Sequence, residues 1–109
     1  MEFLINNEAD VNSKNEENFT PLHFGAVNGH QNVVECLINN GANVNSKNET
    51  ICTSFHFAAD NGHQNVVEFL INSRANVNLK NENNQTPLHL ATENGHQNVV
   101  VVSSKMGQM

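Results

Sequence analysis

Apolar residues in this chain gather in short stripes at helical spacing, with polar stretches between them. One stripe spans residues 33–38 (VVECLI) and predicts a helix of about ten residues that begins near Gln31. Gly41 follows as a C-terminal cap, because glycine adopts the left-handed backbone conformation at little cost. A helix of this length is not stable alone in water, so it must pack against neighbouring elements.

A shorter helix is predicted just before it. Thr20 and Pro21 form a helix start, since the threonine hydroxyl can cap a free backbone donor and proline fits the first helical position. The pair Asn28-Gly29 ends this helix near Asn28. Residues 43–49 (NVNSKNE) are turn formers without a helical period, and we expect them to form an extended finger or hairpin loop.

These elements return at one constant interval, so the chain consists of repeats. The string NGHQNVV occurs three times and begins at Asn28, Asn61 and Asn94. The same interval separates three helix starts, TPLHF at residues 20–24, TSFHF at 53–57 and TPLHL at 86–90. It also separates two copies of ANVN, at residues 42–45 and 75–78. Helix pairs of this kind, stacked side by side, would bury one narrow continuous core.

The period of about 33 residues, TPLH, the turn ending in G-H, the VV-x-x-L-I helix and G-A-N-V-N resemble the ankyrin repeat. The resemblance implies an all-α fold, an ankyrin-repeat solenoid of stacked helix-turn-helix units with projecting finger loops. We expect a single domain over residues 1–109. It divides into a partial leading repeat (residues 1–16), a repeat (17–49), a degenerate repeat (50–82) and a repeat with a truncated or altered second helix (83–109).

The middle repeat departs most from the pattern. Ile51 occupies the finger position that Asn18 and Asn84 take in the neighbouring repeats, and asparagine tolerates a left-handed conformation that a β-branched residue resists. If the turn is kept, Ile51 costs about 1–2 kcal/mol. The alternative is a relaxed loop. Arg74 likewise stands where the previous repeat has its capping Gly41.

Both ends of the chain also depart from a complete repeat. Residues 1–12 align with the end of a second helix and its loop, whereas Ser103 and Ser104 replace Leu70 and Ile71 in the last helix. That helix loses its inward apolar side chains. Because terminal repeats normally carry a polar outer face, we expect a piece of a longer array or a truncated gene product, of marginal stability alone.

Charge and composition narrow the class of partner. The net charge of −6 opposes binding to a phosphate backbone, so nucleic acid is not an expected partner. No stretch approaches the roughly eighteen consecutive apolar residues of a membrane helix, and the first residues lack a secretory signal pattern. We therefore expect a cytoplasmic, monomeric array that does not insert into a membrane.

The histidines and cysteines are the candidates for chemistry. The histidines at 23, 56 and 89, and those at 30, 63 and 96, lie one repeat apart and cannot converge on one metal. The resemblance implies that each TPLH histidine bonds to the threonine at its helix start. Cys36 should pack on its apolar stripe, whereas Cys52 takes a finger position expected to be exposed, as a neutral position, a contact residue or a reactive thiol. No catalytic constellation is formed, so we expect neither an enzyme nor a cofactor.

Function should lie where the repeats differ and face outward. By the resemblance, these positions are the finger tips and the ends of the first helices. They are Glu16, Glu17, Phe19, Val27, Asn28, Glu49, Thr50, Cys52, Asp60, Asn61, Glu82, Asn83, Gln85, Glu93 and Asn94. We call this set the variable strip; it is acidic and contains no lysine or arginine.

The variable strip predicts binding of another protein, with a basic or polar face or peptide as the favoured partner. Phe19 is the expected anchor, because exposed aromatic residues contribute strongly to interfaces. The plain alternative is that the strip is only solvent-exposed surface. An alternative from another class is that the chain is the ankyrin segment of a larger secreted toxin or host-targeted effector, where it would serve assembly or docking of a distant domain.

Overall fold

The computed structural model describes residues 10–106, and this part of the chain folds into six helices and no strands. The helices are α1 (Pro21–Val27), α2 (Gln31–Asn39), α3 (Ser54–Asp60), α4 (Gln64–Asn72), α5 (Pro87–Glu93) and α6 (Gln97–Met106). The predicted all-α fold is confirmed. The predictions for residues 1–9 and 107–109, which belong to the first and last repeats, lie outside the described residues.

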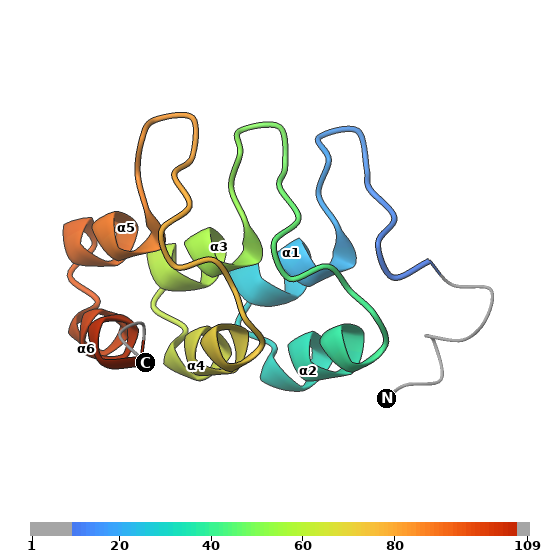
Figure 1. The fold of residues 1–109 in the computed structure, drawn as a ribbon. Coiled ribbons are helices and arrows are strands. Elements are labelled where there is room, and N and C mark those ends of the chain that lie inside the picture. Colours follow the sequence, from blue (N-terminus) through green and yellow to red (C-terminus); the bar gives the residue numbers. More distant parts are fainter. Residues whose placement is uncertain (1–9, 107–109) are drawn as a thin grey trace.

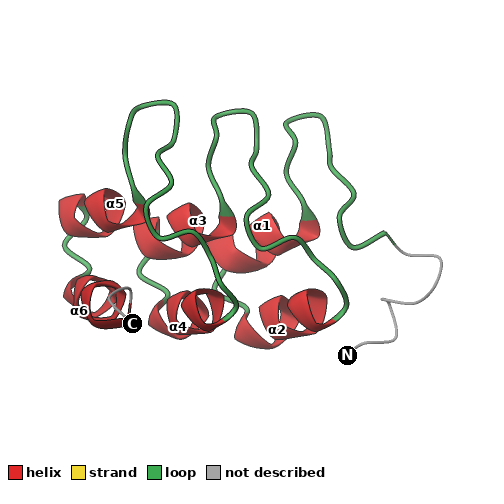
Figure 2. Cartoon of the chain, in the orientation of Figure 1, coloured by secondary structure: helices red, strands yellow, loops and turns green. Residues whose placement is uncertain are grey.

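The helices form two parallel rows (Figure 1). α1, α3 and α5 make the first row, and α2, α4 and α6 make the second row beneath it. Three loops rise beside the first row as fingers, all on the same side of the array (Figure 2). The chain measures 39 × 25 × 22 Å along its principal axes, so it extends along the direction of stacking. This is the solenoid that the resemblance implied.

Each first helix begins at a capping box made by threonine and histidine. The His23 backbone N–H donates to Thr20 Oγ1 at 3.2 Å, and the Thr20 N–H donates to His23 Nδ1 at 2.9 Å. Thr53 with His56, and Thr86 with His89, form the same box. The predicted local bond is therefore confirmed. It satisfies free donors of helices that are only seven residues long.

The first two of these histidines also hold the following finger. Because Nδ1 of His23 accepts the Thr20 N–H, its proton lies on Nε2, which donates to the Ser46 carbonyl at 2.9 Å. His56 Nε2 donates to the Gln85 carbonyl at 3.0 Å. Both imidazoles are fully buried. The start of each of these helices is thus tied to a loop that lies well beyond it along the chain.

A second set of histidines joins each repeat to the one before it. Gly29 and Gly62 turn the chain with φ of +69° and +74°. A Cβ built on Gly29 would lie 2.6 Å from the nearest atom of the His63 ring, and one on Gly62 would lie 2.7 Å from the His96 ring. His63 Nε2 donates to the Val27 carbonyl at 2.9 Å. We call this contact the glycine–histidine joint.

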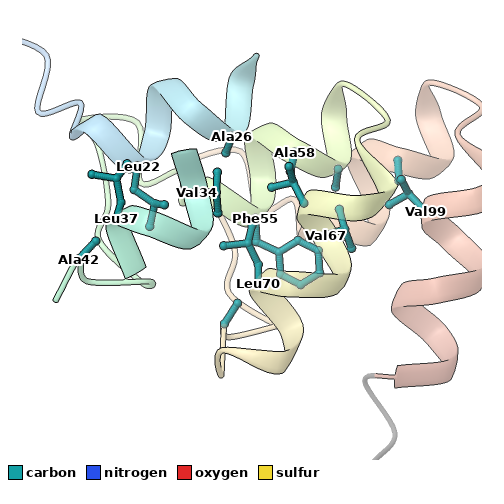
Figure 3. Close-up of a cluster of buried hydrophobic side chains, with 14 residues drawn as sticks. Leu22, Ala26, Val34, Leu37, Ala42, Phe55, Ala58, Val67, Leu70 and Val99 are labelled. Atoms are coloured by element: carbon teal, nitrogen blue, oxygen red, sulfur yellow. The ribbon is translucent and has the colours of Figure 1, made fainter. Parts of the chain in front are cut away.

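The core is a single narrow band between the two rows (Figure 3). Alanines line it from the first helices, and Ala26, Ala58 and Ala91 are completely buried. Their small side chains let neighbouring helices approach closely. Larger residues such as Leu22, Phe55 and Leu70 fill the space between rows, which makes every short helix dependent on its neighbours.

The degenerate repeat keeps its loop geometry. Ile51 has φ of +62°, close to the +64° of Asn18 and the +60° of Asn84. The turn is therefore retained and Ile51 bears the steric cost of a β-branched side chain in the left-handed region. Arg74 is also left-handed, with φ of +73°.

The last helix carries a buried polar defect. Ser103 replaces the fully buried Leu70 of the previous repeat, and its side chain is buried too. Among the residues that the structure describes, its Oγ has no hydrogen-bond partner. The predicted loss of inward apolar residues in α6 is thus visible as an unsatisfied hydroxyl, which weakens the packing of this helix.

Replacing Ile51 with asparagine should stabilise the chain by about 1 kcal/mol, because asparagine relieves the left-handed strain. Urea unfolding measures the change. Val33 is the matched control, since it is as exposed as Ile51, 41% for each side chain, but lies in a helix. Val33→Asn should bring no gain, and an equal gain in both variants would contradict the strain explanation.

Stability should fall as the pH is lowered through about 6.5. Burial lowers the pKa of His23 and His56 below the ordinary 6.5, and nearby Lys14 lowers that of His23 further. The folded chain therefore keeps both rings neutral, while the unfolded chain takes up protons near pH 6.5 and is favoured below it. Urea unfolding between about pH 7.5 and pH 5.5, above the carboxylate range, measures this.

His56→Gln is the matched variant for this pH effect. It should lower the free energy of unfolding at pH 7.5, since it removes the bond to the finger, yet reduce the further loss on acidification. A pH-independent free energy of unfolding in the parent chain would show that the rings are not held neutral.

Candidate interaction surface

One asparagine builds the turn at each finger tip. Asn15 Oδ1 accepts the backbone N–H groups of Glu17 and Phe19 at 2.9 and 3.0 Å. Asn48 and Asn81 do the same in the next two fingers. Asn48 and Asn81 are buried although they lie in loops. The sequence pattern included only Asn48, as one of several turn formers, and the recurrence of asparagine at the repeat interval was the signal for a shared role.

Neighbouring finger tips are linked by backbone hydrogen bonds. The Glu49 N–H donates to the Glu17 carbonyl at 3.2 Å, and the Glu82 N–H donates to the Thr50 carbonyl at 3.0 Å. The structure therefore brings the predicted tip residues into one row across three fingers. These residues are Glu16, Glu17, Phe19, Glu49, Thr50, Cys52, Glu82, Asn83 and Gln85.

The predicted residues at the helix ends are partly structural. The side-chain amides of Asn28 and Asn61 donate to the carbonyls of Phe24 and Phe57, four residues earlier, at 2.9 Å. They thus cap their own helices. The side chains of Val27 and Asp60 are half-buried.

The third helix end behaves differently. The Asn94 amide donates to the backbone carbonyl and the carboxylate of Asp60 in the preceding repeat. Glu93 is exposed, and its carboxylate accepts from the Gln85 side chain at 3.5 Å. This last contact connects the finger row to the helix-end row.

Two tip residues are less exposed than the sequence suggested. Phe19 is half-buried, with its ring centroid 5.6 Å from that of His23, 5.2 Å from that of Phe24 and 5.3 Å from that of Phe57. Cys52 is half-buried and its Sγ lies 3.8 Å from the amide nitrogen of Asn81. The expectation that these positions are exposed was wrong, because side chains from other elements partly cover them.

The most exposed aromatic residue beside the variable strip is Phe24, which the sequence pattern did not single out. Its side chain is 49% exposed on α1, while its ring contacts that of Phe19 in a tilted arrangement. Phe57 and Leu90 occupy the same position on α3 and α5 and are half-buried. The signal was an apolar residue at the same point of all three first helices, off the buried face.

The charged members of the variable strip are all acidic, while an exposed lysine precedes each finger tip, at Lys14, Lys47 and Lys80. Its carboxylates at Glu16, Glu17, Glu49, Glu82 and Glu93 are all exposed, and that of Asp60 is half-buried. None of its members is a lysine or arginine. Exposed carboxylates of one sign in a row attract cationic groups, and the attraction weakens as salt is added.

The histidines and cysteines were the candidates for metal binding and nucleophilic chemistry. Among residues 10–106, no group of three or more histidine, cysteine or acidic side chains is placed to hold a metal ion. Cys36 is half-buried on α2. A separate finding is that none of the helices in this part of the chain is both long and apolar enough to cross a membrane.

Comparison with known proteins identifies a family. A family model described as ankyrin repeats, in three copies, matches residues 1–48 and 47–102. A search of curated proteins finds no match. Residues 1–48 and 47–102 together cover most of the 109 residues, and the two rows of helices with fingers have the architecture that the match requires. The chain belongs to the ankyrin-repeat family.

Proposed function

We propose that this chain is a non-catalytic module that binds a basic or polar face of another protein through the variable strip. Ankyrin repeats are in general protein–protein interaction modules. The observation that carries the finer proposal is the row of exposed carboxylates on three linked finger tips, which follow the exposed Lys14, Lys47 and Lys80 of the same fingers.

The backbone links between fingers support this role. Because Glu49 and Glu82 are tied to the preceding tips through backbone atoms, their side chains remain free for a partner. The tips are also held before binding, so little conformational entropy is lost when a partner docks. A preorganised acidic row favours lysine and arginine side chains at matching spacing.

Phe24 supplies the apolar part of the proposed surface. Its exposed ring continues the cluster formed by Phe19 and Phe57. Aromatic residues with exposed area on a rigid support are typical energetic centres of interfaces, while charges around them set orientation. We therefore assign to Phe24 the anchor role that the sequence suggested for Phe19.

Peptides selected on the chain from a phage-displayed random library should be rich in lysine and arginine. Binding of the best peptide should weaken on the order of tenfold, or about 1.4 kcal/mol, in the double variant Glu17→Lys/Glu49→Lys. Calorimetry measures this. The matched control is Glu35→Lys/Glu68→Lys, with the same change in net charge on α2 and α4. Equal losses in both variants would refute the location, and selected peptides without basic residues would refute the partner class.

Phe24→Ala should weaken binding of the same peptide by about 1–2 kcal/mol, because it removes the exposed aromatic anchor. Val101→Ala serves as control, since Val101 is 52% exposed but lies on α6, away from the variable strip. Unchanged affinity in Phe24→Ala, with the chain still folded by circular dichroism, would remove Phe24 from the surface.

A further inference from the structure

The glycine–histidine joint has two parts, which come from different repeats. The receiving part is a left-handed glycine turn together with the backbone carbonyl two residues before the glycine. An example is Gly62 with the carbonyl of Asp60. The inserting part is the histidine of the next repeat, whose ring covers the glycine and whose Nε2 donates to that carbonyl; His96 does so at 2.9 Å. The described chain contains this joint twice.

The α5–α6 face carries a receiving part that no residue between 10 and 106 covers. Gly95 has φ of +74°, like Gly62, yet a Cβ built on it would have no neighbour within 4 Å. Leu88 is 37% exposed, whereas its counterparts Leu22 and Phe55 are 1% exposed. Beside α5 this face has an open, shallow depression of about 490 Å³, lined by Asn84, Gln85, Leu88, His89, Thr92 and Glu93.

The histidine of the third capping box also lacks the packing that its counterparts have. His89 is exposed, although its counterparts His23 and His56 are fully buried and donate to a finger carbonyl. Among residues 10–106, His89 Nε2 has no such acceptor. The face therefore presents a donor, an apolar side chain and a glycine turn in the arrangement that two internal repeats use for stacking.

The opposite face, on α1 and α2, carries the inserting part. His30 is exposed, whereas His63 and His96 are half-buried against glycine turns. Val33 is 41% exposed, whereas its counterparts Val66 and Val99 are 1% and 0% exposed. The two faces lie at opposite ends of the rows of helices (Figure 1).

We propose that two copies of this chain associate head to tail, with the α1–α2 face of one copy stacked on the α5–α6 face of the other. His30 of the second copy covers Gly95 of the first and donates to its Glu93 carbonyl, while Val33 of the second copy covers part of the same face. This is the internal joint formed between two molecules, and it replaces the monomer expected from the sequence. The contact is heterologous, so it continues into longer chains as concentration rises.

Charge sets the conditions under which this association occurs. Each copy carries a net charge of −6, so two copies repel one another in dilute buffer. Added salt screens this repulsion and leaves the apolar and hydrogen-bonded contacts of the joint in place. Head-to-tail association should therefore strengthen with ionic strength, whereas binding of a basic partner to the variable strip should weaken.

Sedimentation of the full 109-residue chain up to about 1 mM, the weak limit of specific binding, tests the proposal. The average mass should rise above the 12.0 kDa of one chain as concentration increases. Gly95→Ala should raise the dissociation constant at least about tenfold, because its methyl group meets the incoming imidazole. A mass of one chain at every concentration, in low and high salt, would overturn the inference.

Gly41→Ala is the matched control. Gly41 is exposed and left-handed, and a Cβ on it would also have no neighbour within 4 Å, but it lies at the end of α2 and outside the joint. It bears the same kind of backbone strain and should leave association unchanged. Equal loss in both glycine variants, or none in Gly95→Ala, would place association elsewhere and refute the proposal.

A double variant locates the contact more finely. Once His30 is replaced by alanine, the methyl group of Gly95→Ala has no ring to meet, so the two changes together should cost less than the sum of their separate effects. Strict additivity would show that residues 30 and 95 do not touch. Neither substitution lies in the variable strip, so failure here leaves the proposed binding of a basic protein untouched.

Discussion

The array depends on the packing of a histidine ring against the glycine turn of the preceding repeat. Glycine is needed there for two independent reasons. Its φ is left-handed, and a Cβ would lie within 3 Å of the ring that covers it, as at Gly29 and Gly62. Because the helices have only seven to ten residues and cannot persist alone, the contact that fixes their spacing also determines whether they form. This contact explains why glycine and histidine recur within NGHQNVV at Gly29, Gly62, His63 and His96.

The histidines at the starts of the first helices hold the fingers in position. His23 and His56 close the first turn of their helices with Nδ1 and hold a finger carbonyl with Nε2. One buried ring therefore sets both the start of a helix and the position of a loop. The surface that we propose for binding is positioned by groups inside the protein, and partner contact is not required to order it.

Local chemistry accounts for what could be predicted from the sequence. Helix starts and glycine ends involve residues close together along the chain, so the pattern alone contained them. The threonine–histidine bond is equally local, but it was expected from the resemblance to the ankyrin repeat. The exposure of Phe19 could not be predicted in this way, since Phe57, which lies 5.3 Å from it, comes from the next repeat. Cys52 was misjudged for the same reason, because Asn81 contacts it from the next finger.

The finger tips show which positions of such a chain are free to vary. Links between tips use backbone atoms of Glu17 and Glu49, so any side chain at these positions keeps the link. Asn48, the residue before Glu49, is fixed because its own side chain builds the turn. Ile51 is an intermediate case: its side chain contributes to no tip bond, but its left-handed backbone penalises a β-branched residue. Variation at a position therefore indicates recognition only where neither its side chain nor its backbone conformation is needed to form the turn, a condition that Glu17 and Glu49 meet and Ile51 does not.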